Sequence, residues 1–111
     1  MFSTRAIYYR VHGFGASTML ITTETLPTTA ADYVGAQGYV SEDGRRWDFS
    51  IRKDADRFLA VWVQQDGRPH YLPARLDFNE RIQVGSYIDR LDHGKKDPDE
   101  YEIDYIGPEL Q

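Results

Sequence analysis

The alternation of apolar and polar residues is the strongest structural signal in this chain. It is cleanest over residues 46–52, where Trp47, Phe49 and Ile51 fall on one face and polar residues fall on the other. A period of two is typical of a β-strand with one buried face. The pattern therefore predicts a sheet whose strands contribute alternate side chains to a core.

Shorter segments rich in β-branched and aromatic residues predict further strands along the whole chain. They cover residues 5–11, 18–26, 39–41, 58–64, 69–76 and 100–106. The Asp-Gly pairs at 43–44 and 66–67 are typical of hairpin turns between neighbouring strands. Pro69 and Pro73 place their segment at a sheet edge or make it irregular, because proline donates no hydrogen bond to a ladder.

Two segments leave the choice between helix and strand open. Residues 55–62 place apolar side chains at helical spacing, but the valine-rich run and the Asp-Gly turn that follow favour a strand. Residues 77–91 begin with a helix-capping pattern, whereas Ile82 and Val84 alternate as in a strand. Gly85 is typical of a bulge in such a strand.

One short helix is predicted at residues 29–37. Thr29 and Asp32 match a capping box, and Gly38 suits the position just past a helix end. We therefore expect a mainly β fold, at the margin of α+β. It would be a small curved antiparallel sheet, or a partly open barrel, of six to eight strands with one short helix. Residues 1–111 are expected to form one compact domain.

Composition narrows the chemistry that this domain can carry. The chain has no cysteine, which excludes disulfides, thiolate nucleophiles and zinc–thiolate sites. Neither a signal peptide nor an apolar run of about 20 residues is present, so we expect a cytoplasmic protein without membrane contact. No histidine cluster, phosphate-binding loop or nucleophile motif occurs, so no catalytic residue, metal or cofactor is predicted.

Charge is distributed unevenly along the chain. The net charge is −5, and the whole excess lies in residues 92–111, where seven acidic residues oppose Lys95 and Lys96. If residues 100–106 are extended, carboxylates point one way at intervals of about 6.6 Å, and Tyr101, Ile103 and Tyr105 point the other way. Such a stripe can steer a basic partner, or it can simply keep an edge strand soluble.

The leading hypothesis is a non-enzymatic inhibitor or adaptor that binds another protein with a basic surface. One form of this hypothesis is a protein that mimics a nucleic acid toward its basic partner, such as a mobile-element inhibitor or a toxin-neutralising protein. The candidate partner-binding residues are Asp97, Asp99, Glu100, Glu102, Asp104, Tyr8 and Tyr9. The two tyrosines are adjacent in a predicted strand, so one of them should be exposed and available as an anchor.

Two alternatives belong to other functional classes. The first is a single-stranded nucleic-acid-binding domain, because basic residues surround the rings of Tyr39, Trp47 and Phe49. These basic residues are Arg45, Arg46, Arg52, Lys53 and Arg57. The second alternative is an enzyme or a small-molecule binder without a sequence motif. Trp62 and Tyr71 would face each other across a regular hairpin, which we interpret as core packing.

Overall fold

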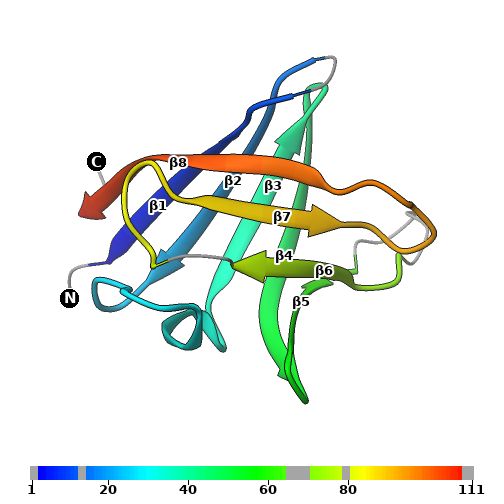
Figure 1. Cartoon of the computed structure of the whole chain (residues 1–111). Coiled ribbons are helices and arrows are strands. Elements are labelled where there is room, and N and C mark those ends of the chain that lie inside the picture. The colour runs from blue at the N-terminus through cyan, green and yellow to red at the C-terminus, as the bar shows by residue number, and fades with distance from the viewer. Residues whose placement is uncertain (1–2, 13–14, 65–70, 79–80, 109–111) are drawn as a thin grey trace.

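The computed structural model describes residues 3–12, 15–64, 71–78 and 81–108. Within these residues, eight antiparallel strands form a closed barrel in which successive strands are neighbours (Figure 1). The strands are β1 (Thr4–Arg10), β2 (Ser17–Thr23), β3 (Gln37–Glu42), β4 (Arg45–Asp54), β5 (Arg57–Trp62), β6 (Ala74–Phe78), β7 (Tyr87–Leu91) and β8 (Asp99–Pro108). The predicted mainly β class is confirmed, with the barrel closed rather than partly open.

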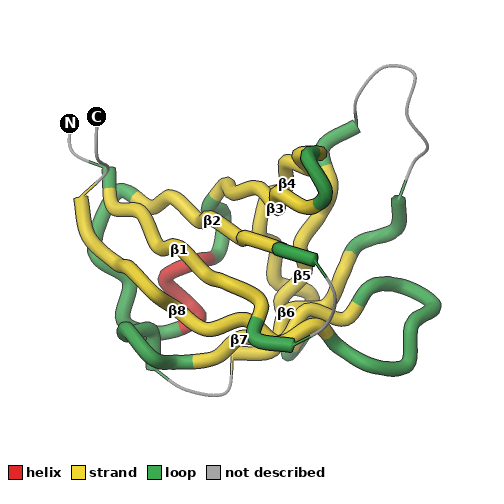
Figure 2. The backbone as a smooth tube through the Cα atoms, turned by 90° about the horizontal axis from the view of Figure 1, so that it is seen from above, coloured by secondary structure: helices red, strands yellow, loops and turns green. Residues whose placement is uncertain are grey.

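The last strand closes the barrel by pairing with both β7 and β1. Thr4 in β1 lies opposite Pro108 in β8, so the start of one strand and the end of the other lie side by side (Figures 1 and 2). Closure pairs both sides of each strand and leaves no edge. The barrel is therefore a continuous wall with an inside and an outside.

The segment around Pro69 and Pro73 was expected to be an edge strand or irregular: residues 71–73 are irregular, whereas the edge-strand alternative is wrong for the described part. β6 pairs with both β5 and β7. Pro73 precedes Ala74, the first residue of β6, so its missing N–H does not interrupt the ladder. Pro69 and the Asp-Gly pair at 66–67 lie outside the described residues.

One tight turn matches its sequence signal. Asp43 and Gly44 join β3 to β4 with φ values of 52° and 75°, as a hairpin turn with two left-handed residues requires. Residues 57–62 form β5, so the strand interpretation of 55–62 is confirmed for this part. The preceding turn contains Ala55, whose φ is also positive, at 54°.

The predicted helix at 29–37 is shorter than expected. Only η1 (Ala30–Tyr33), a single turn of 3-10 helix, forms. The Asp32 carboxylate accepts hydrogen bonds from the backbone N–H groups of Thr28 and Thr29 at 2.8 and 3.1 Å, which lower its pKa. Gly35 then adopts a φ of +85°, and residues from 37 onward pair with β2 and β4 instead. Sheet pairing thus takes over the second half of the predicted helix.

Residues 81–86 connect β6 to β7 without forming a strand or a helix. Ile82 is buried at the end of the barrel, and its N–H donates to the Thr28 carbonyl at 2.9 Å. Val84 is exposed, and Gly85 has a φ of +91° in a turn. The strand alternative for Ile82 and Val84 and the predicted bulge at Gly85 are therefore wrong. The positive φ of Gly85 belongs to a turn instead.

The barrel interior is filled with side chains at the end where η1 lies. Tyr33 is fully buried, its ring packs against Phe78 at 5.5 Å, and its hydroxyl lies 2.7 Å from that of Tyr8. Burial raises the pKa of Tyr33 to about 12, although the hydrogen bond to Tyr8 opposes this rise. Burial and the neighbouring Tyr33 raise the pKa of Tyr8 further. Both hydroxyls therefore stay neutral and satisfy each other.

This buried hydroxyl pair leads to a prediction about stability. Tyr8→Phe or Tyr33→Phe alone should destabilise the protein by about 1–2 kcal/mol, because each leaves the other hydroxyl buried without that partner. The double variant should lose clearly less than the sum of the two single losses. Urea unfolding of all four proteins measures this coupling, and strictly additive losses would contradict the pairing.

β8 is extended as predicted, but a bulge interrupts its alternation. Its pairing with β1 shifts by one residue, so that Ile7 lies opposite Tyr105 whereas Tyr8 lies opposite Ile103. Asp104 is the extra residue. Beyond it, Ile106 packs against the core, and the Tyr105 hydroxyl donates to the Pro108 carbonyl on the exposed side at 2.8 Å. The expectation that Tyr105 faces the core is therefore wrong.

Candidate functional site

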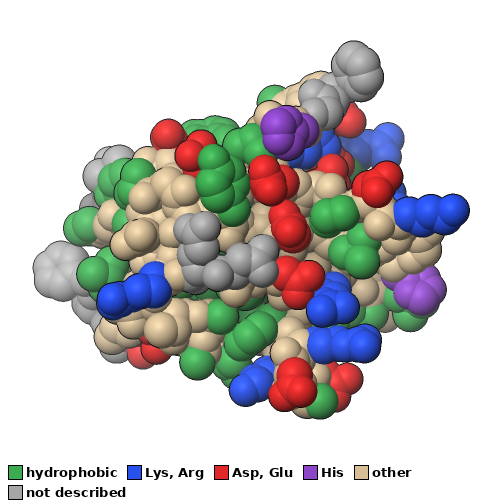
Figure 3. All heavy atoms as spheres, viewed as in Figure 1, with side chains coloured by type: hydrophobic (Ala, Val, Ile, Leu, Met, Phe, Trp, Pro, Cys, Tyr) green, Lys and Arg blue, Asp and Glu red, His purple; other side chains and the backbone are tan. Residues whose placement is uncertain are grey.

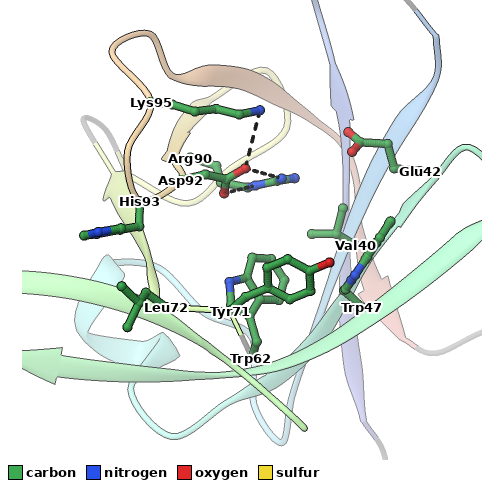
Figure 4. A pocket seen from close by; sticks show the side chains of 10 residues that line it. All are labelled: Val40, Glu42, Trp47, Trp62, Tyr71, Leu72, Arg90, Asp92, His93 and Lys95. Carbon is green, nitrogen blue, oxygen red and sulfur yellow. Dashed lines mark hydrogen bonds and ion pairs between the residues drawn. The ribbon is translucent and has the colours of Figure 1, made fainter. Parts of the chain in front are cut away.

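The barrel end opposite η1 is open and contains a cavity of about 450 Å³. This mouth lies where β1, β3, β5 and β7 end and where the strands that follow them begin. The lining residues are Val40, Glu42, Trp47, Trp62, Tyr71, Leu72, Arg90, Asp92, His93 and Lys95 (Figure 4). They come from β3, β4, β5, β7 and the segments before β6 and after β7.

Aromatic side chains form one wall of this cavity. Trp47 lies opposite Val40 in the ladder and shares the inward face of β4 with the buried Phe49. The Trp62 ring meets Phe49 edge to face, with ring centroids 5.8 Å apart. Both tryptophans remain partly exposed because they sit where the packed interior gives way to the mouth. They present flat apolar surface to the cavity.

Tyr71 completes this wall from the segment before β6. It is 54% exposed, so the interpretation of Trp62 and Tyr71 as a core pair is wrong for Tyr71. The ladder between β5 and β6 extends only from Phe58 to Ala60 among the described residues. Tyr71 therefore meets the cavity from irregular backbone rather than across a regular hairpin.

A buried arginine forms the polar side of the cavity. Arg90 is only 7% exposed and donates to both carboxylate oxygens of Asp92, at 2.8 Å from Nε and 2.7 Å from Nη2. Its Nη1 donates to the Tyr101 hydroxyl at 2.9 Å, and that hydroxyl lies 2.7 Å from Ser17 Oγ. Burial alone would lower the pKa of Arg90, but Asp92 and the other neighbours outweigh it and raise the pKa. The guanidinium therefore stays charged inside the barrel.

The remaining charged groups at the mouth are also paired. Arg10 Nη1 lies 3.1 Å from Glu42 Oε1 and 3.8 Å from Asp99 Oδ1. Lys95 Nζ lies 3.8 Å from Asp92 Oδ2 (Figure 4). Each carboxylate in the cavity lining thus has a cationic neighbour. The lining combines aromatic surface with balanced ion pairs.

Sequence reasoning missed this site although one of its signals is visible in the chain. Arginine and aspartate two residues apart share a face of a strand. The pattern occurs four times, at 46–48, 52–54, 75–77 and 90–92, and the pairs at 46–48, 75–77 and 90–92 form salt bridges. Only the last pair contains a buried arginine. The pattern alone cannot separate an internal pair from two surface pairs.

The acidic residues of β8 belong to a row that crosses three strands. Asp77 lies opposite Asp89, which lies opposite Glu100, and the three occupy the outer face. Figure 3 shows acidic side chains in a column over β6–β8. Burial and the charges of Glu100 and Asp77 raise the pKa of Asp89. The row therefore repels itself at neutral pH.

Removing one charge from this row should stabilise the protein. Because the folded-state pKa of Asp89 is raised, its carboxylate destabilises the fold above that pKa and has no such effect below the unfolded pKa. Asp89→Asn should therefore gain up to about 0.5 kcal/mol at pH 7. The gain should vanish at about pH 3, below the ordinary pKa of aspartate. Urea unfolding at both pH values measures it. Asp48→Asn, which removes the partner of Arg46, should show no gain.

The other predicted partner-binding residues occupy different positions. Asp97 is exposed in the loop before β8, Asp104 is exposed at the bulge, and Asp99 turns toward Arg10. Tyr9 is 47% exposed on the outer face, as one of the two tyrosines was expected to be. Tyr8 is buried and bonded to Tyr33, so it cannot anchor a partner.

Glu102 lies between two exposed rings. Its ladder partners are Tyr9 in β1 and Tyr87 in β7, and both tyrosines are exposed. Glu100, two residues before Glu102 on the same face of β8, lies 3.7 Å from the exposed His12. The outer face around β8 therefore combines carboxylates with accessible aromatic surface.

The basic residues of the nucleic-acid alternative fall into two groups. One group lies at the start of β4, and the other lies about 20 Å along that strand, around its end. They are Arg45 and Arg46 in the first group, and Arg52, Lys53 and Arg57 in the second. Arg46 is stacked over Tyr39 at 3.9 Å and paired with Asp48 at 2.8 Å. Phe49 is buried and cannot stack on a base.

Comparisons with protein-family models, with curated proteins and with solved structures found no match. No helix among the described residues is long and apolar enough to cross a membrane. Over the same ranges, no three histidine or acidic side chains come together as metal ligands would. The class that the fold defines is an eight-stranded antiparallel barrel with one packed end and one open mouth.

Proposed function

We propose that this protein binds a small molecule in the cavity at the barrel mouth. The observation that carries the proposal is the cavity itself, of about 450 Å³ and lined by two tryptophans beside a buried Arg90–Asp92 pair. Cavities of about 300–1,000 Å³ with apolar walls and a few placed polar groups are typical of ligand sites. Eight-stranded barrels either fill their interior or hold one small ligand.

The distribution of packing within the barrel supports this proposal. The η1 end is filled by Tyr33, Phe78 and their neighbours, whereas the mouth keeps large rings partly exposed. A barrel that served only as a scaffold would gain stability by packing both ends, because buried apolar area contributes about 25 cal/mol per Å². A bound molecule would cover the exposed rings.

Thermal unfolding with a library of small molecules tests the proposal, because a ligand that binds the folded state raises the melting temperature. Leu72→Asp provides the site variant, and Leu26→Asp is its matched control. These leucines are 58% and 60% exposed, but only Leu72 lines the cavity. Leu72→Asp should weaken binding about tenfold, equivalent to about 1.4 kcal/mol, while Leu26→Asp should leave it unchanged. Equal effects of the two variants would contradict the proposal.

A second candidate function is the binding of a protein with a basic surface through the outer face of β8. The row of Asp77, Asp89 and Glu100 favours it, as does Glu102 between two exposed tyrosines. Tyrosine is enriched at interfaces, and surface charge steers a partner of opposite charge. In this proposal, the face would steer a cationic partner and the rings would anchor it.

Charge reversal tests the second candidate. Changing Glu100, Glu102 and Asp104 to lysine should abolish capture of the partner from extracts of the native host and leave the melting temperature near that of the original protein. The control reverses three exposed acids elsewhere, Glu24, Asp54 and Asp56. Capture that survives the first change, with the same salt dependence, would remove this candidate.

A further inference from the structure

From the pairing of charges at the mouth, we infer that the ligand is an uncharged, flat aromatic molecule of one or two fused rings. It would carry a hydrogen-bond donor and an acceptor side by side, as a lactam does. This inference rests on the proposed small-molecule function and adds the chemical class of the ligand. Three features of the cavity support it: the balance of charge, the remaining hydrogen-bonding capacity and the shape of the aromatic wall.

Charge balance argues against an ionic ligand. Asp92 already accepts two hydrogen bonds from Arg90 and forms an ion pair with Lys95, and Glu42 is paired with Arg10. An anion would have to compete with Asp92 for Arg90 while lying close to the Asp92 carboxylate. A cation would meet Arg90 and Lys95. Either ion would bring a poorly compensated charge into a partly desolvated site, which is strongly unfavourable.

The polar side of the cavity retains both kinds of hydrogen-bonding group. A guanidinium has five N–H donors. Three of those on Arg90 are used by Asp92 and Tyr101 within the described residues, which leaves two. Carboxylates such as Asp92 and Glu42 can accept more bonds than they do here. A neutral ligand with one acceptor and one donor would use this capacity without disturbing the ion pairs.

The aromatic side of the cavity suits a flat ring. Figure 4 shows the rings of Trp62 and Tyr71 facing the group of Arg90, Asp92 and Lys95, and the guanidinium carbon of Arg90 lies 5.6 Å from the centroid of the Trp62 ring. Trp47 extends the aromatic surface from the adjacent strand. Stacking a planar ring on such side chains contributes about 1–3 kcal/mol per ring in nucleic-acid complexes. A fused bicycle stacked on this wall would direct its polar edge at Arg90 and Asp92.

Four bicyclic probes of similar size test the inference on the unmodified protein. They are 2-quinolone (a neutral lactam), naphthalene (no polar edge), 2-naphthoate (an anion) and 1-methylquinolinium (a cation). Calorimetry gives their affinities, and the indole N–H signals in NMR locate binding, because Trp47 and Trp62 are the only tryptophans of the chain and both line the cavity. We expect 2-quinolone to bind about tenfold tighter than each of the others and to shift both indole signals.

The outcomes separate this inference from the proposed function. Equal affinities for all probes, or a tighter ion, would overturn the neutral-lactam class while leaving a small-molecule site in place. If none of the probes binds but a library compound does so in a Leu72-dependent manner, the class is again wrong and the function stands. If no compound of any kind binds, both fail.

A variant adds a second measurement of the same inference. Arg90→Lys removes the guanidinium fork but keeps a cation, so it should reduce the affinity for 2-quinolone to that for naphthalene. Arg75→Lys is the matched control and should preserve the tenfold preference, because Arg75 pairs with Asp77 on the exposed outer face and does not line the cavity. A preference that persists in a folded Arg90→Lys protein would contradict the assigned role of Arg90. If Arg90→Lys does not fold, the four probes on the original protein still test the inference.

Discussion

Gly38→Ala is expected to destabilise the barrel by about 3 kcal/mol, among the largest losses for a single added methyl group. Gly38 lies in β3 between Ile21 and Phe49 of the neighbouring strands. A Cβ at this position would overlap the Leu20 carbonyl oxygen and lie 2.8 Å from Phe49 Cζ. The ring can turn, but the carbonyl belongs to the sheet backbone. The strands would therefore have to separate.

Gly107→Ala is the matched control for this change. Gly107 also lies in a strand, and a Cβ there would meet only the side chain of Tyr105, at 2.9 Å from its hydroxyl oxygen. That side chain is partly exposed and can move, so the loss should stay below about 1 kcal/mol. Urea unfolding of both variants decides the comparison. Similar losses would show that the close approach at Gly38 is unimportant.

The second large effect is expected for Asp92→Ala, at about 3 kcal/mol. This change leaves the buried guanidinium of Arg90 without the carboxylate that accepts two of its hydrogen bonds. Tyr101 would remain as its hydrogen-bond partner, but a neutral hydroxyl does not compensate a buried charge. Urea unfolding at neutral pH measures the loss.

Two further variants show whether this loss comes from the ion pair. Lys95→Ala removes the exposed cation 3.8 Å from Asp92 and should change stability by about 0.5 kcal/mol or less. Combining Asp92→Ala with Arg90→Met should recover part of the stability, because no unpaired charge then remains inside the barrel. A double variant as unstable as the sum of its single changes would show that the pair is not coupled.

The mouth therefore links stability with the proposed binding site. The groups that would contact a ligand, Arg90 and Asp92, also hold the end of β7 and, through Tyr101, the start of β8. Trp62 packs on the core with one edge, and both Trp62 and Trp47 line the cavity. A molecule bound there would bury the exposed rings and stabilise the same end of the barrel. Thermal unfolding is for this reason a sensitive test of binding.

Local features of the fold follow from the sequence alone. The alternation at 46–52 predicts β4, the Asp-Gly pair at 43–44 predicts the turn before it, and the alternating acids at 100–104 predict an extended β8. Each feature depends on neighbours within a few residues. The strand period and the positive φ of a turn are properties of the local chain. They determine the class of the fold.

Inside and outside were decided by pairing between distant strands. In β1, Ala6 and Tyr8 alternate with Ile7 and Tyr9, so both faces are apolar enough to be the core. Pairing with β2 and β8 selects the first face, and the bulge at Asp104 exchanges the faces beyond it. The two-residue period of the sequence predicts neither which face is buried nor where the bulge lies, since a shift of one residue exchanges every side chain between the faces.

The candidate site depends on tertiary structure in the same way. Arg90–Asp92 resembles two surface pairs in sequence, and only barrel closure turns Arg90 inward beside Trp62. Gly38 matches a helix end locally, yet the sheet uses it for close packing against Phe49. The sequence by itself determined the strands and their turns through short-range backbone and side-chain preferences. The closed barrel, its packed end and its open mouth required contacts between residues far apart in the chain.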